Sequence, residues 1–410
     1  MLTPVIVIYT IIRAIKYKDR RYLLQRFCFT QFKTSGEHKN PVWIHAASVG
    51  EVIAVIPLIK SIRKHYPALA IQITSNTNTS ADIVKNQLAC VENLKHYYMP
   101  IDWKWAMKKI IKLTQPRCIL IVETEIWPNL FCYSQQQQIP LLIINARLSH
   151  RTTNAKPWLL TIYKKTLNNT TKILARSIDD YDSYLKLGAK KSNLKLMGNI
   201  KLASHTEQTV TSIAFERNYV LAASTHEDEE LQLATIWKQL ITDKIVSDEI
   251  LVIVPRHPER ANSIAQKIKT LLSNIAIRSH NDSISDITQI YIADTVGELK
   301  QFMVSAKFIF MGGSLIAHGG QNIIEPAQLH KAIIFGQHMF NFKDECKLLI
   351  ENNAAIQVTN KEELYKSFSD LLQEPKKVKQ LANSAVKIIK TQGDNILQHY
   401  MLEIKKYLKE

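Results

Sequence analysis

Short apolar segments alternate with amphipathic segments of helical length along most of the chain, and this alternation constrains the fold more than any other feature. The apolar runs of the first half are rich in Val, Ile, Leu and Tyr and occupy residues 42–45, 70–74, 117–122, 140–145 and 172–175. Stretches such as 52–65 and 103–114 lie between them and have the pattern of helices. Strands that alternate with helices predict a parallel sheet with helices on both faces.

The same alternation resumes in the second half, after a polar segment at residues 205–217. The later apolar runs lie at residues 219–223, 249–254, 289–293, 307–311 and 332–335. A chain of 410 residues is too long for one ordinary domain and long enough for two packed cores. We therefore expect two α/β domains, at residues 31–207 and 208–410, the second of which ends in basic helices.

Residues 1–30 are expected to form a separate N-terminal segment. Residues 2–12 are almost wholly apolar, but a helix needs about 20 such residues to span a bilayer. A basic cluster follows and gives the first 33 residues a net charge of +6, from Arg13, Lys16, Lys18, Arg20, Arg21, Arg26 and Lys33 against Asp19. A secretory signal has the opposite order. The segment predicts a membrane anchor or interfacial helix on anionic cytoplasmic lipid, and a first helix packed on the domain is the alternative.

The charge balance of the whole chain points to an anionic partner. Lys and Arg number 53 against 36 Asp and Glu, which gives a net charge of +17. Nucleic acid, a phosphorylated metabolite and an anionic membrane would each suit such a field. The chain lacks the aromatic motifs of RNA-binding domains, and its acidic residues at strand ends would repel a phosphate backbone, so we expect no nucleic acid.

The spacing of potential metal ligands argues against a metal site. The five cysteines form no Cys-x-x-Cys pair, which favours free thiols in a reducing compartment. The thirteen histidines include no His-x-x-x-His pair. Asp180 and Asp182 could hold a divalent cation, but Ser177 precedes them at an expected helix start, and first-turn acids after a cap explain them better.

Acidic residues follow two of the expected strands. Glu51 lies at a helix start after the first strand, and Glu123 and Glu125 follow the run at 117–122. Ligands of open α/β sheets bind at this carboxyl edge. Glu51 is therefore either a general base or a helix-start acid that interacts with the helix dipole, and at least one of Glu123 and Glu125 is expected only to solvate a loop.

Basic and glycine-rich segments occupy other strand ends. Arg147 and Lys201 lie near the expected interdomain crevice, and Arg256 follows the run at 249–254; cations there suit an anionic ligand. Glycine turns at 312–314 and 318–322 precede a helix and could bring backbone N–H groups to a phosphate. Their spacing matches neither the dinucleotide nor the P-loop motif, and tight turning alone is the alternative.

Taken together, these segments resemble the Kdo (3-deoxy-D-manno-octulosonic acid) transferases of bacterial lipid A assembly. The resemblance runs from end to end and rests on Ser-Val-Gly-Glu at 48–51, Thr-Glu-Ile-Trp-Pro at 124–128, Asn-Ala-Arg-Leu-Ser at 145–149, Pro-Arg-His-Pro at 255–258, Asp-Thr-Val-Gly-Glu at 294–298, Gly-Gly-Ser at 312–314 and Asn-Ile-Ile-Glu-Pro at 322–326. It implies a GT-B glycosyltransferase, with two Rossmann-like domains facing across a cleft. It also implies metal-independent, inverting transfer of Kdo from CMP-Kdo to a lipid A precursor, lipid IVA, with no cofactor, at the cytoplasmic face of the inner membrane.

The resemblance also assigns roles to residues. Glu51 matches the family's general base, and Glu125 and Lys201 match residues that stabilise the transition state. The segments that match those holding CMP are Pro255 and Arg256, then Val296, Gly297 and Glu298, and finally Asn322, Ile323, Ile324 and Glu325. A GT-B enzyme with a UDP-hexose donor is the alternative, and the nucleotide released would distinguish the two.

Overall fold

The computed structural model describes residues 3–30, 40–204, 211–213, 215 and 217–408. The chain divides into two compact units, residues 1–204 with 393–410, and residues 205–392. The expected boundary at 207–208 and Lys33 of the basic cluster lie outside the described residues. The chain end departs from the expected division, because its described part, residues 393–408, belongs to the first unit rather than the second.

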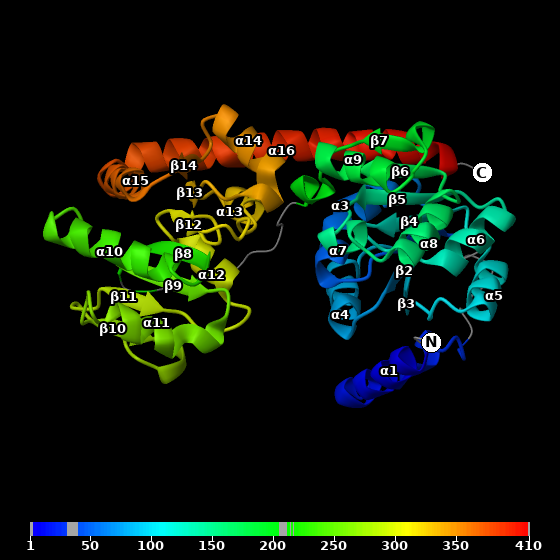
Figure 1. Cartoon of the computed structure of the whole chain (residues 1–410), viewed down its shortest axis with the longest axis horizontal. Helices are drawn as coiled ribbons and strands as arrows, with labels where there is room; N and C mark the ends of the chain where they lie inside the picture. The colour runs from blue at the N-terminus through cyan, green and yellow to red at the C-terminus, as the bar shows by residue number, and fades with distance from the viewer. Residues whose placement is uncertain (1–2, 31–39, 205–210, 214, 216, 409–410) are drawn as a thin grey trace. The chain divides into compact units, whose positions relative to one another are not determined.

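The first unit contains a seven-stranded parallel sheet in the order β3-β2-β1-β4-β5-β6-β7 (Figure 1). The first six strands have the order of a Rossmann fold. The strands are β1 (Val42–His45), β2 (Ile71–Ser75), β3 (Leu94–Tyr98), β4 (Cys118–Val122), β5 (Leu141–Ala146), β6 (Lys172–Ala175) and β7 (Leu194–Leu196). The central strands are buried along their whole length, as a sheet covered on both faces requires.

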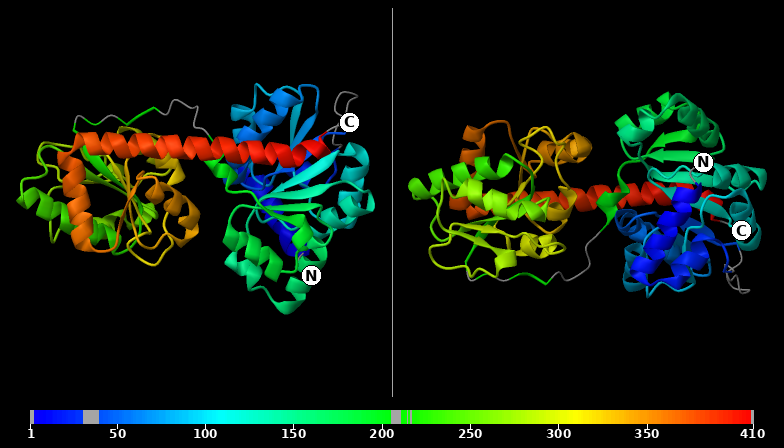
Figure 2. Two further views of the ribbon diagram at one scale, coloured as in Figure 1. Left: turned by 90° about the horizontal axis from the view of Figure 1, so that it is seen from above. Right: turned by 60° about the horizontal axis from the view of Figure 1, so that its bottom comes forward.

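Helices cover both faces of this sheet (Figure 2). The helices along residues 3–204 of this unit are α1 (Thr3–Tyr17), α2 (Arg20–Arg26), α3 (Val49–His65), α4 (Asn78–Gln87), α5 (Lys104–Thr114), α6 (Pro128–Gln136), α7 (His150–Thr153), α8 (Pro157–Leu167) and α9 (Ile178–Lys186), followed by a 3-10 turn at Ile200–Ala203. Side chains cap four of these helices, because Oδ1 of Asp19 and the hydroxyl oxygens of Ser48, Thr77 and Ser177 accept from backbone N–H groups in the first turn. The core on one face of the sheet includes the fully buried Trp43 and Phe131.

The second unit also contains a seven-stranded parallel sheet, in the order β10-β11-β9-β8-β12-β13-β14. Its strands are β8 (Tyr219–Thr225), β9 (Ile250–Pro255), β10 (Ile275–Ile277), β11 (Ile290–Ile292), β12 (Ile309–Met311), β13 (Ile333–Gly336) and β14 (Ile356–Val358). The helices are α10 (Glu229–Thr242), α11 (Ala261–Ile268), α12 (Leu299–Ser305), α13 (Ile324–Gln328), α14 (Lys343–Glu351) and α15 (Lys361–Gln373), before the long α16 (Pro375–Ile404). Trp237 and Phe368 are fully buried in its core.

The last part of α16 explains why the chain end belongs to the first unit. Tyr400 is fully buried, and its hydroxyl accepts from the Asn145 N–H (3.1 Å) and donates to the Gly198 carbonyl (3.2 Å). A Cβ on Gly393 would lie 2.3 Å from the carbonyl oxygen of Leu202. Only glycine permits that close approach of helix and turn.

The segment at residues 1–30 is also divided in the structure. α1 exposes Val5, Ile8, Ile12 and Ile15, whereas α2 packs on β3. The buried Gln25 accepts from the Tyr98 N–H at 2.7 Å through its Oε1 atom. α2 is therefore integral to the first unit, and the part that resembles an interfacial helix is α1 alone. No helix in the described part of the chain combines the length and apolar character that crossing a bilayer requires.

Candidate active site

Three carboxylates lie close together at the point where the strand order of the first sheet reverses. The chain runs from β1 outward to β2 and β3 and then returns to β4 on the other side of β1, so the ends of β1 and β4 form the topological switch point at which α/β sheets bind ligands. Glu51 follows β1, while Glu123 and Glu125 follow β4. The charges of Glu123 and Glu125 act on Glu51. The predicted convergence of acids from separate strand ends is found in the structure.

Glu51 lies in the first turn of α3 with both carboxylate oxygens engaged. Its Oε2 accepts from the Ala47 N–H (2.8 Å), and its Oε1 accepts from the Ser48 hydroxyl (2.9 Å). Burial, reinforced by the charge of Glu123, outweighs these bonds and raises its pKa to about 7. A carboxyl that titrates near neutral pH suits a proton acceptor, although the same contacts also cap the helix.

The sequence predicted that at least one of Glu123 and Glu125 only solvates a loop. Glu123 is instead buried, and it is paired with a cation. Its Oε1 lies 2.7 Å from Lys201 Nζ. Asn145, at the end of β5, holds this pair in place: its Nδ2 donates to Glu123 Oε1 (3.4 Å), and its Oδ1 accepts from the Ile200 N–H (3.1 Å). Lys201 therefore joins the acidic cluster through Glu123, and its side chain remains about one-third exposed.

Glu125 lies in a different electrostatic environment from Glu51. Its Oε2 is 3.9 Å from Nε2 of His45, a fully buried residue at the end of β1. Burial alone would raise the pKa of Glu125, but His45 and the charge of Arg26 outweigh it, so the pKa falls below its usual value. His45 was not predicted; its position as the last residue of the first strand was the available signal. Opposite pKa shifts on neighbouring carboxyls separate an acid–base group from a permanent charge.

The expected nucleotide-binding residues lie at one edge of the second sheet. Pro255 ends β9 and Arg256 follows it, exposed to solvent. Val296, which is 87% exposed, and Gly297, with φ of +93°, form the loop between β11 and α12. Ile323 and Ile324 are buried at the start of α13. These segments follow strands that are neighbours or near neighbours in the sheet.

The polar side chains of these segments are held by ion pairs and a cap. Arg278 makes a two-bond pair with Glu298, at 2.7 Å to each oxygen. Lys300 Nζ lies 2.7 Å from Glu325 Oε1, which ties α12 to α13. Asn322 Oδ1 accepts from the Ile324 N–H (3.1 Å). The second and third nucleotide segments are therefore brought together, and Glu298 and Glu325 are paired with cations of the protein.

The first glycine turn does not offer its backbone to a phosphate, contrary to expectation. Glu229, fully buried at the start of α10, accepts from the N–H groups of Gly313 (2.6 Å), Ser314 (2.9 Å) and Leu315 (3.0 Å). The Gly320 N–H donates to the Gly313 carbonyl (2.7 Å). A carboxylate of the protein fills the place that we expected for a phosphate. The turn is thus a rigid support beside the site.

Comparison with known proteins adds the family. A sequence family described as "3-Deoxy-D-manno-octulosonic-acid transferase (kdotransferase)" matches residues 21–204. The 3-deoxy-D-manno-octulosonic acid transferase of Haemophilus influenzae is 31% identical over 97% of this chain and 93% of its own length. That of Rickettsia prowazekii is 34% identical over 90% of this chain and 80% of its own.

The chain belongs to the Kdo transferase family. The transferase is thus a glycosyltransferase, as its motifs indicated. Among solved structures, the UDP-GlcNAc 2-epimerase of Neisseria meningitidis, bound to UDP-GlcNAc, gives a TM-score of 0.60 at 14% identity, over 88% of this chain and 100% of that one. The epimerase of Listeria monocytogenes gives 0.59 at 13% identity, over 90% and 97%. At this identity the likeness concerns the fold, and it confirms two parallel-sheet α/β domains of the GT-B class.

The Asp-x-Asp motif of the transferase has a structural role. Asp180 is buried, accepts from the Leu148 N–H (3.0 Å), and pairs with Arg176 at 2.9 Å. Ser177 caps the helix through the Asp180 N–H. Within the described ranges, no group of three His, Cys, Asp or Glu side chains is arranged to hold a metal ion.

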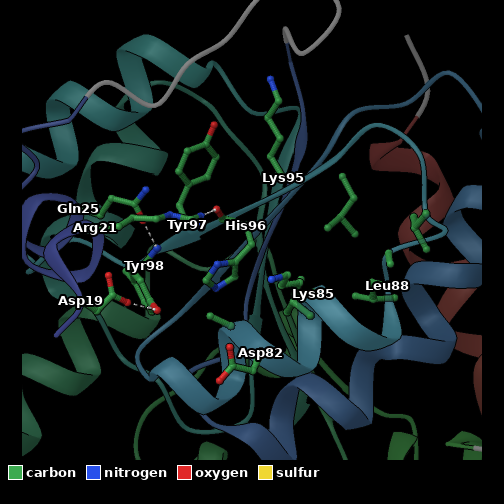
Figure 3. A pocket seen from close by; sticks show the side chains of 15 residues that line it. Asp19, Arg21, Gln25, Asp82, Lys85, Leu88, Lys95, His96, Tyr97 and Tyr98 are labelled. Carbon is green, nitrogen blue, oxygen red and sulfur yellow. Dashed lines mark hydrogen bonds between the residues drawn. The ribbon is translucent and has the colours of Figure 1, made fainter. Parts of the chain in front are cut away.

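A separate cavity of about 950 Å³ lies between α2, α4 and the edge strand β3 (Figure 3). One end is tied by Asp19, whose Oδ2 accepts from the Tyr98 hydroxyl (2.8 Å), and by Arg21, which donates to the His96 carbonyl. His96 Nε2 lies 2.8 Å from the Ser75 hydroxyl, and burial lowers the pKa of His96 to about 3. None of the predicted site residues lines this cavity.

Proposed function

We propose that the protein transfers Kdo from CMP-Kdo to the lipid A precursor lipid IVA, with inversion and without a metal, in lipopolysaccharide core biosynthesis. The observation that carries this proposal is the Glu51 carboxyl, which lies at the switch point of the first sheet with a pKa near 7. Membership of the family identifies the transferred sugar as Kdo. The acceptor, the stereochemistry and the role of Glu51 are the proposed part.

In the proposed reaction, Glu51 accepts the proton of an acceptor hydroxyl as that oxygen attacks the anomeric carbon of Kdo. The bond from the anomeric carbon to the phosphate oxygen breaks, and CMP leaves with the electron pair. Attack on the face opposite the leaving group inverts the anomeric carbon. Glu125, held ionised by His45, and Lys201, held by Glu123, are then the charges that stabilise the transition state.

The second unit is proposed to hold CMP. Arg256 is exposed at the carboxyl end of β9, and its guanidinium suits a single phosphate. Val296 and Gly297 expose backbone beside the Arg278–Glu298 pair. Glu325, which lies at the start of α13 beside Lys300 and has its side chain about one-quarter exposed, is placed to accept from ribose hydroxyls.

We further propose that α1 rests on the anionic cytoplasmic face of the inner membrane. α1 exposes several large apolar side chains on its length: Val5, Ile8, Tyr9, Ile12 and Ile15. Lys16 and Lys18 are also exposed on or just after this helix, and Arg13 is partly exposed. Apolar burial in the headgroup region and attraction to anionic lipid would act together.

The test is a transfer assay with purified protein, CMP-Kdo and lipid IVA, read by mass spectrometry of the lipid and by detection of released CMP. We expect addition of Kdo that persists in EDTA. A UDP-hexose donor serves as the control. Transfer from the UDP-hexose but not from CMP-Kdo, or strict dependence on Mg²⁺, would contradict the proposal.

A further inference from the structure

Three histidines from different parts of the second unit meet at the carboxyl edge of its sheet. His226 follows β8, His257 follows β9, and His318 lies in the loop after β12. The ring centroids of His226 and His318 are 3.8 Å apart with planes inclined by 35°, and those of His226 and His257 are 6.0 Å apart. The chain leaves β9 and its outer neighbours and returns to β12 on the other side of β8. His226 therefore occupies the switch point of this sheet.

The central histidine is fixed in position and neutral. His226 is 7% exposed, and its Nε2 lies 3.0 Å from the amide nitrogen of Gln321. An amide nitrogen only donates, so this contact makes Nε2 the acceptor and leaves the ring proton on Nδ1. The His226 backbone N–H donates to Glu229 (2.9 Å), which also holds the glycine turn. His226 is thus held through both its ring and its backbone.

The surroundings of the histidines are positive. Burial, followed by the charges of His318, His257, Arg260 and Arg256, lowers the pKa of His226 to about 4. The acids nearby already have partners. Glu229 accepts four backbone N–H groups, Glu230 pairs with Arg260 at 3.0 Å, Glu227 with Lys267 at 3.0 Å, and Glu259 lies 3.6 Å from His257. An anion bound here would meet several donors.

Two features indicate which anion fits. The donor of the proposed function carries two separate negative groups, the phosphate and the carboxylate of the sugar. Arg256 is an exposed cation in the first of the nucleotide segments and would bind one of these groups. The backbone donors of the first glycine turn already donate to Glu229. We therefore expect side chains to bind the second negative group of the donor.

We propose that His226 and His318, supported by Gln321, bind the carboxylate of the donor sugar and so select an acidic sugar. This inference rests on the proposed function, because it presumes CMP-Kdo as donor. His318, exposed on the face of the His226 ring, makes the direct contact with the carboxylate. His226 positions His318 by stacking and offers its Nδ1 proton.

The experiment compares His318→Asn and His226→Gln with the wild-type enzyme and with His330→Asn as the matched control. His330 is an exposed histidine that precedes β13, at the opposite end of the strands, and has φ of +58°, which Asn tolerates. Steady-state kinetics give KM for CMP-Kdo, competition gives the inhibition constant of CMP, and thermal unfolding monitors the fold. His318 is exposed, so its variant should fold normally even if His226→Gln does not.

We expect the KM for CMP-Kdo to rise by about 10- to 100-fold in His318→Asn, as loss of a hydrogen bond to a charged group implies, while CMP inhibits as strongly as before. His330→Asn should behave as the wild type. If CMP inhibition weakens in parallel with KM, the cluster serves the phosphate and the inference is overturned. An unchanged KM in His318→Asn also overturns it while the proposed function stands, whereas a wild-type enzyme that neither binds nor uses CMP-Kdo overturns both.

Discussion

Replacing Glu51 with Gln should abolish most activity and yet stabilise the protein at alkaline pH. The pKa of Glu51 in the folded state is about 7, against a usual value of 4.5. Because the folded pKa is raised, the ionised carboxylate disfavours folding, and this cost is absent below about pH 4.5 and complete above about pH 7. The difference between these two pKa values corresponds to a destabilisation of the folded state by about 3 kcal/mol.

Glutamine is always neutral and so removes this cost, but it cannot accept both hydrogen bonds from Ala47 and Ser48. Each weakened hydrogen bond costs about 1 kcal/mol. The variant should therefore be more stable than the wild type by about 1–2 kcal/mol at pH 8, and slightly less stable at pH 5. Turnover at pH 8 should fall by about 10²- to 10⁴-fold if Glu51 is the base, and wild-type kcat/KM should decline as pH falls below about 7.

Thermal unfolding at pH 5 and pH 8, together with the transfer assay, tests both parts. Glu363→Gln is the matched control, since Glu363 occupies the same position in the first turn of α15 and accepts from the Thr359 N–H (2.7 Å) and hydroxyl (2.9 Å). The pKa of Glu363 is lowered by those bonds, so its replacement should destabilise most at high pH and leave activity intact. If Glu51→Gln shows the same stability difference from wild type at both pH values, the reasoning about Glu51 is refuted.

Three further predictions test other parts of the site. Lys201→Met should lower both stability and activity, because Glu123 loses its ion pair, and adding Glu123→Leu should restore the unfolding temperature but not the turnover; recovered turnover would make the pair purely structural. Arg256→Ala should weaken CMP binding by about 1.5–3 kcal/mol in calorimetry, and unaltered binding would place the phosphate elsewhere. Deletion of residues 1–17, which leaves α2 in place, should abolish sedimentation with vesicles that contain anionic phospholipid, and persistent sedimentation in high salt would contradict the role of α1.

The expected strands coincide with the interior strands of both sheets, and the strands that were missed are the four at the sheet edges. β3 and β7 bound the first sheet, and β10 and β14 bound the second. Interior strands are buried on both faces and therefore read as unbroken apolar runs. β3 has the sequence Leu-Lys-His-Tyr-Tyr and is mostly half-buried, so it gives no such run. The fold class could thus be predicted, while the width of each sheet could not.

Apolar runs also explain which residues of the candidate site could be predicted from the sequence and which could not. Motifs at strand ends located Glu51, Glu125 and Arg256, because the end of an apolar run marks the carboxyl edge of a parallel sheet. Lys201 follows β7, a strand that was missed, and its role was assigned by the family resemblance. The partners of these residues could not be located in this way. Glu123 and Lys201 are 78 positions apart in the sequence. They come into contact only when β4, β5 and the turn at Ile200–Ala203 have folded together.

The support of Lys201 depends on a still more distant part of the chain. Asn145 contacts Glu123 and the Ile200 N–H through its side chain, while its own N–H donates to Tyr400, 255 positions later. Tyr400 is buried, and its hydroxyl also fixes the Gly198 carbonyl just before the turn. The final turns of α16 thus hold the turn that presents Lys201, although nothing in their amphipathic pattern distinguishes them from an ordinary surface helix. A pattern of apolar residues can show that a helix packs, but the residue that it supports is decided by the tertiary fold.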